Sequence, residues 1–110
     1  MLKKLLSEMS EQELHDEIKR CQQSAKEAIE DGMLSEYQVY EQRYYMAKSY
    51  LMNKDDIQIG ATYGIENDTN LFIVEYLRGV LAYGKALGQT EEKAYPIGIL
   101  VPLDFAPNEE

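Results

Sequence analysis

The stretch FIVEYLRGVLAYG, residues 72–84, is the most apolar run of the sequence and decides how its second half folds. A helix over this run would enclose Gly79 and Gly84, at a cost of roughly 1 kcal/mol each relative to alanine. A β-hairpin uses Gly79 directly, because glycine supplies the positive φ that a two-residue turn needs. The run therefore favours a hairpin with Arg78-Gly79 as its turn, while the helix stays open as an alternative.

This turn divides the hairpin residues between two faces of a sheet, with Leu77 opposite Val80. One face is expected to hold Phe72, Val74, Tyr76, Leu81 and Tyr83. The other is expected to hold Leu71, Ile73, Glu75, Leu77, Val80, Ala82 and Gly84. Because both faces are mainly apolar, both need cover. We expect one face in a core and the other under helices or a partner.

Shorter strand signals lie on both sides of the hairpin. Apolar residues alternate from Ile57 to Ile65, which is the period of a strand. The segment NDTN (67–70) is typical of a turn, and GQTEEK (88–93) of a polar loop. YPIGIL (95–100) predicts a last short strand that Pro102 ends. The second half therefore predicts four or five short strands.

The first half has the pattern of two helices. Ser10 and Glu13 form the capping box of a first helix, and Gly32 suits its end. One apolar stripe then runs along that helix, formed by Leu14, Ile18, Cys21, Ala25 and Ala28. The short link around Gly32 predicts that the next helix folds back antiparallel.

That second helix is expected over residues 34–52. Its main stripe is formed by Tyr37, Tyr40, Tyr44, Ala47 and Leu51. Val39, Tyr45, Met46 and Met52 lie partly outside the stripe, so the helix needs a second neighbour. The strands could supply it. Alternatively, two copies of the chain could pair into a four-helix bundle, with Tyr45 and Met46 at the contact.

The order of these segments resembles that of a known family. The capping-box helix, MAKSYLMNKDD, GATYGIEN, FIVEYLRGVLAYG and AYPIGIL follow one another as in the YfhH-like family of small uncharacterised proteins from Gram-positive bacteria. The resemblance implies an α+β fold, with a helical hairpin over residues 1–56 and a small SH3-like β-barrel over 57–102. Residues 103–110 lie outside the resemblance, and their composition predicts an acidic tail. The resemblance brings no established activity and no catalytic residues.

Charge and composition exclude several classes of protein. Residues 1–56 carry 8 basic and 12 acidic side chains, residues 57–110 carry 3 and 8, and the net charge is −9. Neither half has the excess of Lys and Arg that nucleic-acid binding relies on. A single cysteine allows no internal disulfide, and no apolar run is long enough to span a bilayer. We expect a cytoplasmic protein with no membrane partner.

Candidate catalytic and metal-binding groups are few. His15 and Cys21 are the only residues of their kinds, too few for a zinc site, and neither belongs to a catalytic arrangement. His15 is expected on a solvated helix face and Cys21 in the core. Four carboxylates could bind a hard cation, although a turn at a helix end explains them better: Asp55, Asp56, Glu66 and Asp68. We expect no cofactor and no enzyme activity.

Nine tyrosines are the most suggestive feature, because tyrosine serves both in cores and at wet interfaces. We interpret the chain as a binding or regulatory module, with protein or a second copy of itself as its partner. The side chains predicted to contact that partner are Tyr45, Met46, Tyr63, Arg78, Lys85 and Tyr95. The alternative is a nucleic-acid-associated regulator using a patch of Arg78, Lys85 and Lys93. An enzyme acting through carboxylates ranks third.

Overall fold

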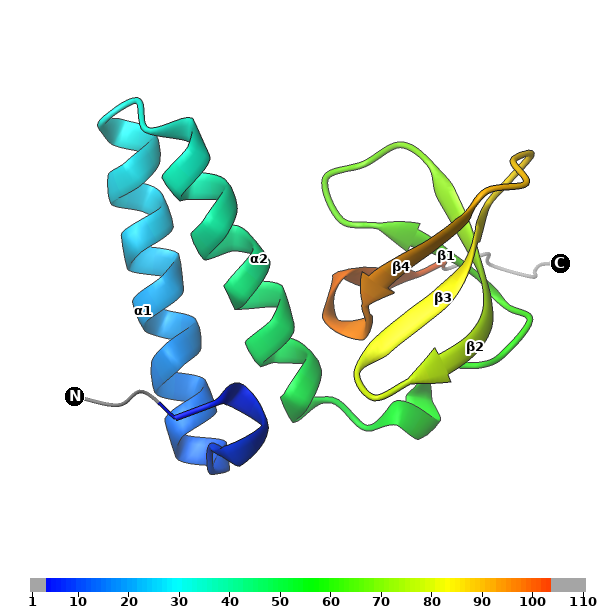
Figure 1. Cartoon of the computed structure of the whole chain (residues 1–110), viewed down its shortest axis with the longest axis horizontal. Helices are drawn as coiled ribbons and strands as arrows, with labels where there is room; N and C mark the ends of the chain where they lie inside the picture. The colour runs from blue at the N-terminus through cyan, green and yellow to red at the C-terminus, as the bar shows by residue number, and fades with distance from the viewer. Residues whose placement is uncertain (1–3, 104–110) are drawn as a thin grey trace, which may run out of the picture.

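The structure is a computed structural model that describes residues 4–103 and consists of a helical hairpin beside an antiparallel sheet (Figure 1). The hairpin is formed by α1 (Glu11–Glu30) and α2 (Leu34–Leu51), and a 3-10 turn, η1 (Leu6–Glu8), precedes it. A second 3-10 turn, η2 (Lys54–Asp56), leads into the sheet. The α+β class and both helices are confirmed. None of the described helices is long and apolar enough to cross a membrane.

Local signals in the sequence set both ends of α1. Ser10 Oγ accepts a hydrogen bond from the Glu13 amide, and Glu13 accepts one from the Ser10 amide, as the capping box predicts. At the other end, the Gly32 amide donates to Ile29 O and the Met33 amide to Ala28 O. This pair of bonds is a Schellman motif, and it turns the chain directly into α2.

The sheet has five strands in the order β4-β3-β2-β1-β5. They are β1 (Thr62–Ile65), β2 (Leu71–Arg78), β3 (Leu81–Ala86), β4 (Glu92–Pro96) and β5 (Leu100–Pro102). Because β4 and β5 are the two edges and no pairing joins them within residues 4–103, the sheet is open. The closed SH3-like barrel is therefore not confirmed. The predicted acidic tail lies, after Leu103, outside the described residues.

Two predicted strands are shorter or divided in the structure. The strand expected from Ile57 begins only at Thr62, because Gly60 has a φ of +88° and forms a bulge. The Gly60 amide donates to Val74 O, while the Val74 amide donates to Ala61 O. This pair of hydrogen bonds is that of a G1 bulge. The strand expected over 95–100 is divided by the 3-10 turn η3 (Ile97–Ile99), and β4 begins inside the expected polar loop.

The central hairpin is confirmed, but its turn lies one residue later than predicted. Arg78 pairs with Leu81, so the loop is Gly79-Val80. Gly79 has a φ of +59° at the first loop position, as in a type II′ turn, which suits the right-handed twist of the strands. The sequence alone placed this glycine second; the shift of the loop changes which residues pair but leaves Tyr76 and Tyr83 on one face, as predicted.

The predicted division of the hairpin into two faces is wrong, because a bulge separates Phe72 and Val74 from the residues nearer the turn. Phe72 and Val74 share the core face with three small residues of β3: Ala82, Gly84 and Ala86. A bulge between Val74 and Tyr76 then moves Tyr76 to the outer face, where it pairs with Tyr83. Those two rings stack with centroids 4.9 Å apart and cover one another. The small side chains of β3 leave room for the larger ones of β2.

The sheet packs on the helical hairpin through α2 and η3, which touch at a small, fully buried contact. Ser49 Oγ donates to Tyr45 O at 2.7 Å and accepts from the Gly98 amide at 2.8 Å. A Cβ added to Gly98 would lie 2.7 Å from Tyr45 O, so only glycine permits this approach. The second neighbour of α2 at this point is therefore the sheet of the same chain.

Candidate functional site

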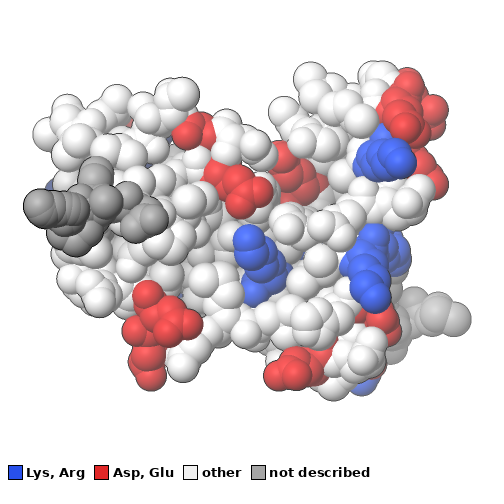
Figure 2. All heavy atoms as spheres, turned by 180° about the vertical axis from the view of Figure 1, so that it is seen from behind, with Lys and Arg blue, Asp and Glu red and all other residues white. Residues whose placement is uncertain are grey.

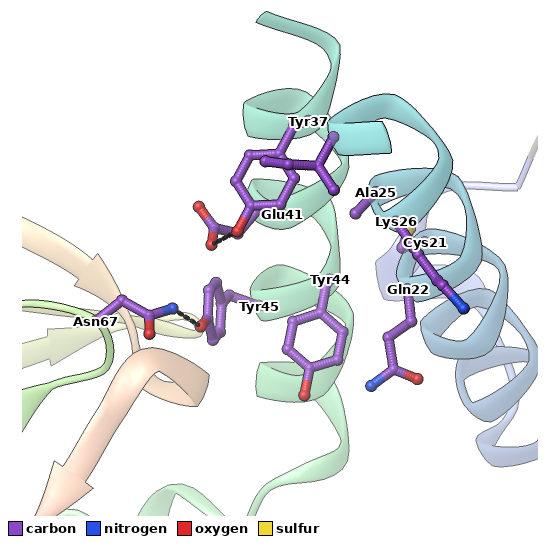
Figure 3. Close-up of a pocket in the computed structure, with 10 residues that line it drawn as sticks. Cys21, Gln22, Ala25, Lys26, Tyr37, Glu41, Tyr44, Tyr45 and Asn67 are labelled. Carbon is purple, nitrogen blue, oxygen red and sulfur yellow. Dashed lines mark hydrogen bonds between the residues drawn. The ribbon is translucent and has the colours of Figure 1, made fainter. Parts of the chain in front are cut away.

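One of several hollows among the described residues is a groove of about 440 Å³ between α1 and α2 (Figure 3). It lies beside the contact with the sheet, where the loop between β1 and β2 forms one wall. Its volume is within the range of about 300–1,000 Å³ that is typical of ligand sites. The lining residues are Cys21, Gln22, Ala25, Lys26, Ile29, Tyr37, Glu41, Tyr44, Tyr45 and Asn67.

The floor of the groove is apolar. Cys21 is fully buried, and burial raises the pKa of its thiol, so that the sulfur stays protonated and packs as a small apolar group. Ala25 leaves space above it, one turn further along α1. Tyr44 closes the opposite side and packs edge-on against the ring of Tyr45, with centroids 5.0 Å apart. The expectation of Cys21 in the core is confirmed.

The rim of the groove is polar and carries both signs of charge. The Tyr37 hydroxyl donates to Glu41 Oε2 at 2.9 Å, and this bond to a carboxylate raises the pKa of Tyr37. Within residues 4–103, no other hydrogen bond and no salt bridge engages the Glu41 side chain. Lys26, on α1, has no salt-bridge partner among the same residues. The rim therefore keeps one anion and one cation for interactions outside the chain.

Tyr45 forms the wall between the groove and the sheet. Its hydroxyl donates to Glu66 Oε1 at 3.1 Å. It also accepts from Asn67 Nδ2 at 3.4 Å, the bond drawn in Figure 3. Burial, together with the bond to Glu66, raises its pKa. The side chain is only 4% exposed. The prediction that Tyr45 contacts a second copy is wrong, because the sheet of its own chain already covers it.

The other predicted contact residues of apolar type are dispersed. Met46 is half-buried beside Leu5 and Tyr50, on the side of α2 near η1. Tyr63 is buried in the core of the sheet, where its hydroxyl accepts from the Gln58 amide at 2.9 Å. Tyr95 packs edge-on against Phe72 with centroids 4.9 Å apart. The core interpretation of these two strand tyrosines, left open by the sequence, is the one that the structure supports.

The three basic residues of the predicted patch do not form one. Arg78 lies over the ring of Tyr83, 5.9 Å from its centroid, and Lys85 forms a salt bridge with Glu75 at 3.4 Å. Lys93 pairs with Gly84, on the opposite face of the sheet from Lys85. On the face shown in Figure 2, Lys and Arg side chains also lie among Asp and Glu. No observation therefore favours the nucleic-acid alternative.

Groups for catalysis or metal binding do not gather in the part of the chain that the structure describes. There, no three His, Cys, Asp or Glu side chains lie close enough to hold a metal ion. His15 is exposed on α1, as expected. Of the four carboxylates considered for a cation, Glu66 instead binds Tyr45, and Asp55 lies in η2.

The sequence interpretation missed the groove, although one signal was present. Tyr37 and Glu41 stand four residues apart on a helix, the spacing at which side chains meet. The contributions of Lys26 and Asn67 could not be seen in this way, because they come from other elements. Asn67 reaches the groove through a left-handed turn with a φ of +64°.

Comparison with known proteins places this architecture in a family. A model described as "Protein of unknown function (DUF1811)" matches residues 4–101. The chain belongs to this family. It is also 37% identical over 100 residues to "Uncharacterized protein YfhH" of Bacillus subtilis (strain 168), covering 90% of this chain and 96% of that protein. The resemblance to YfhH-like proteins seen in the sequence is thereby confirmed.

Proposed function

We propose that this chain is a non-enzymatic, cytoplasmic protein-interaction module, and that its groove between α1 and α2 receives the partner. The role is regulatory or structural rather than catalytic. One observation carries the proposal: an apolar floor is surrounded by a rim whose Glu41 and Lys26 have no charged partner in the described chain. An apolar centre with a polar rim is the usual anatomy of a protein interface.

The chemistry of the floor agrees with binding. The buried thiol of Cys21 has a raised pKa, which does not suit a nucleophile. The tyrosine rings of the groove offer apolar area with polar tips, and such side chains are enriched where proteins meet. As the finer architecture we propose an SH3-like curl of the sheet, which the resemblance to the YfhH-like family implies, with β4 and β5 as its two edges, not joined to each other within residues 4–103.

Affinity capture with a blocked groove tests this function. Gln22 is exposed and lines the groove, whereas its neighbour Gln23 is exposed and does not. We expect the unmodified chain and Gln23→Trp to capture the same proteins from a lysate of the source organism, and Gln22→Trp to lose them. Mass spectrometry of the three captures gives the comparison. Identical captures by all three chains, or none at all, would contradict a role for the groove.

A further inference from the structure

The charges on the rim of the groove stand at nearly the same height on two antiparallel helices. Lys26 lies six residues before Gly32 on α1, and Glu41 lies nine residues after it on α2. At 1.5 Å per residue these positions differ by only about 5 Å along the hairpin. The groove therefore presents a cation on one side and an anion on the other, at one level.

Such an arrangement is complementary to itself. A two-fold axis parallel to the helices, lying in the face of the hairpin, places α1 of one copy over α2 of the other. Lys26 then faces Glu41 of the second copy, and Glu41 faces Lys26 of the second copy. Both ion pairs form at once, and neither needs a change in the fold.

The apolar residues between these charges extend along both helices. Ala25 and Ile29 are four residues apart on α1, and Tyr37 and Tyr44 are seven apart on α2; Cys21 lies buried beneath them. Ile29, the groove residue of α1 nearest to the turn at Gly32, is 50% exposed. Two such hairpins packed face to face make the apolar centre of a four-helix bundle.

We propose that the occupant of the groove is a second copy of this chain, packed around that axis with two reciprocal Lys26–Glu41 pairs. The proposal rests on the proposed function, whose partner it names. It differs from the dimer expected from the sequence, because Tyr45 is covered by its own sheet and takes no part. The net charge of −9 opposes association at long range, but this repulsion is largely screened beyond about 8 Å at physiological salt.

Sedimentation equilibrium of the full chain in physiological salt, from roughly 5 to 500 µM, tests the pairing. We expect a reversible monomer–dimer equilibrium. Lys26→Glu and Glu41→Lys should each weaken association at least about tenfold, because each sets like charges against one another twice. The double variant exchanges the two charges and should restore the dissociation constant to within about threefold of the parent.

Matched controls lie outside the groove. Lys54→Glu in η2 and Glu36→Lys on α2 make the same changes of charge at exposed positions and should leave association within about threefold of the parent. Circular dichroism checks that every variant is folded. If a reversal unfolds the chain, Lys26→Gln and Glu41→Gln replace it, each with an expected weakening of about threefold.

Three results would overturn the proposal. These are a monomer at every concentration, a dimer whose dissociation constant is unchanged by the single charge reversals, or a double variant whose dissociation constant does not return towards that of the parent. The capture experiment separates this failure from failure of the proposed function. A monomeric chain that still loses captured proteins through Gln22→Trp would keep the groove as an interface with another protein. A monomeric chain that captures the same proteins with and without Gln22→Trp would contradict both the dimer and the proposed function of the groove.

Discussion

Replacing Gly98 by alanine should weaken the contact between the sheet and the helical hairpin. The added Cβ would lie 2.7 Å from Tyr45 O and 2.9 Å from Ser49 Oγ, whereas ordinary contacts begin near 3.4 Å. Neither neighbour is the free end of a flexible chain, because one is backbone and the other holds two hydrogen bonds. The turn η3 must therefore retreat from α2 by several tenths of an ångström.

The cost has two parts. Overpacking a closely packed contact costs about 1–3 kcal/mol. The retreat also lengthens the buried bond from the Gly98 amide to Ser49 Oγ, worth about 1 kcal/mol. We therefore expect the free energy of unfolding to fall by about 2–4 kcal/mol in urea titrations followed by circular dichroism.

Gly64→Ala is the matched control for this substitution. Gly64 lies in β1, and a Cβ there would meet its nearest neighbours at 3.6 Å, an ordinary contact. This control should therefore unfold within about 0.5 kcal/mol of the parent, or be slightly more stable. Equal stability of Gly98→Ala and the parent would refute the argument that glycine is needed for η3 to meet α2.

Three further predictions concern the ends and links of the elements. Ser10→Ala should lower the free energy of unfolding by about 1 kcal/mol, since it removes the acceptor for the Glu13 amide; an unchanged thermal midpoint would contradict that cap. Gly79→Val places a β-branched residue at a φ of +59° and should cost about 1–3 kcal/mol, measured in urea. The third concerns acid: hydrogen bonds from Arg20, and from Arg43 across the hairpin, lower the pKa of Glu17 to about 2 from an ordinary 4.5. Since the folded pKa is the lower one, this stabilisation is complete above pH 4.5 and is lost as the pH falls through 2. It should amount to about 2 kcal/mol of the free energy of unfolding. Glu17→Gln should abolish this part of the acid dependence of the urea midpoint.

Much of the helical half could be predicted because its signals are local. The capping box at Ser10 and the end of α1 at Gly32 each involve residues within one helical turn, so the sequence contains all of the interacting groups. The existence of a central hairpin was likewise predictable from one glycine between two apolar runs. Of the groove, only the pair of Tyr37 and Glu41 was visible at that level.

The tertiary structure decided which face each strand turns to the core. The bulge between Val74 and Tyr76 adds one residue to β2, whereas the turn at Gly79-Val80 changes which residues pair but not the face that they occupy. One extra residue reverses every side chain beyond it, and an alternating apolar pattern on both faces does not specify where such a bulge falls. Tyr76 and Tyr83 therefore moved out of the predicted core, while the small residues of β3 moved in.

Which segment covers α2 was also determined by the tertiary structure. From its sequence, the second helix needed two partners, and the sheet and a second copy were equally acceptable. Gly98, 49 residues after Ser49, supplies the close contact that seats the sheet there and buries Tyr45. The sequence by itself determined that α2 must be covered, because an apolar surface of that width is unstable in water. What covers it depended on long-range packing, because shape complementarity between distant segments leaves no periodic signal in either one.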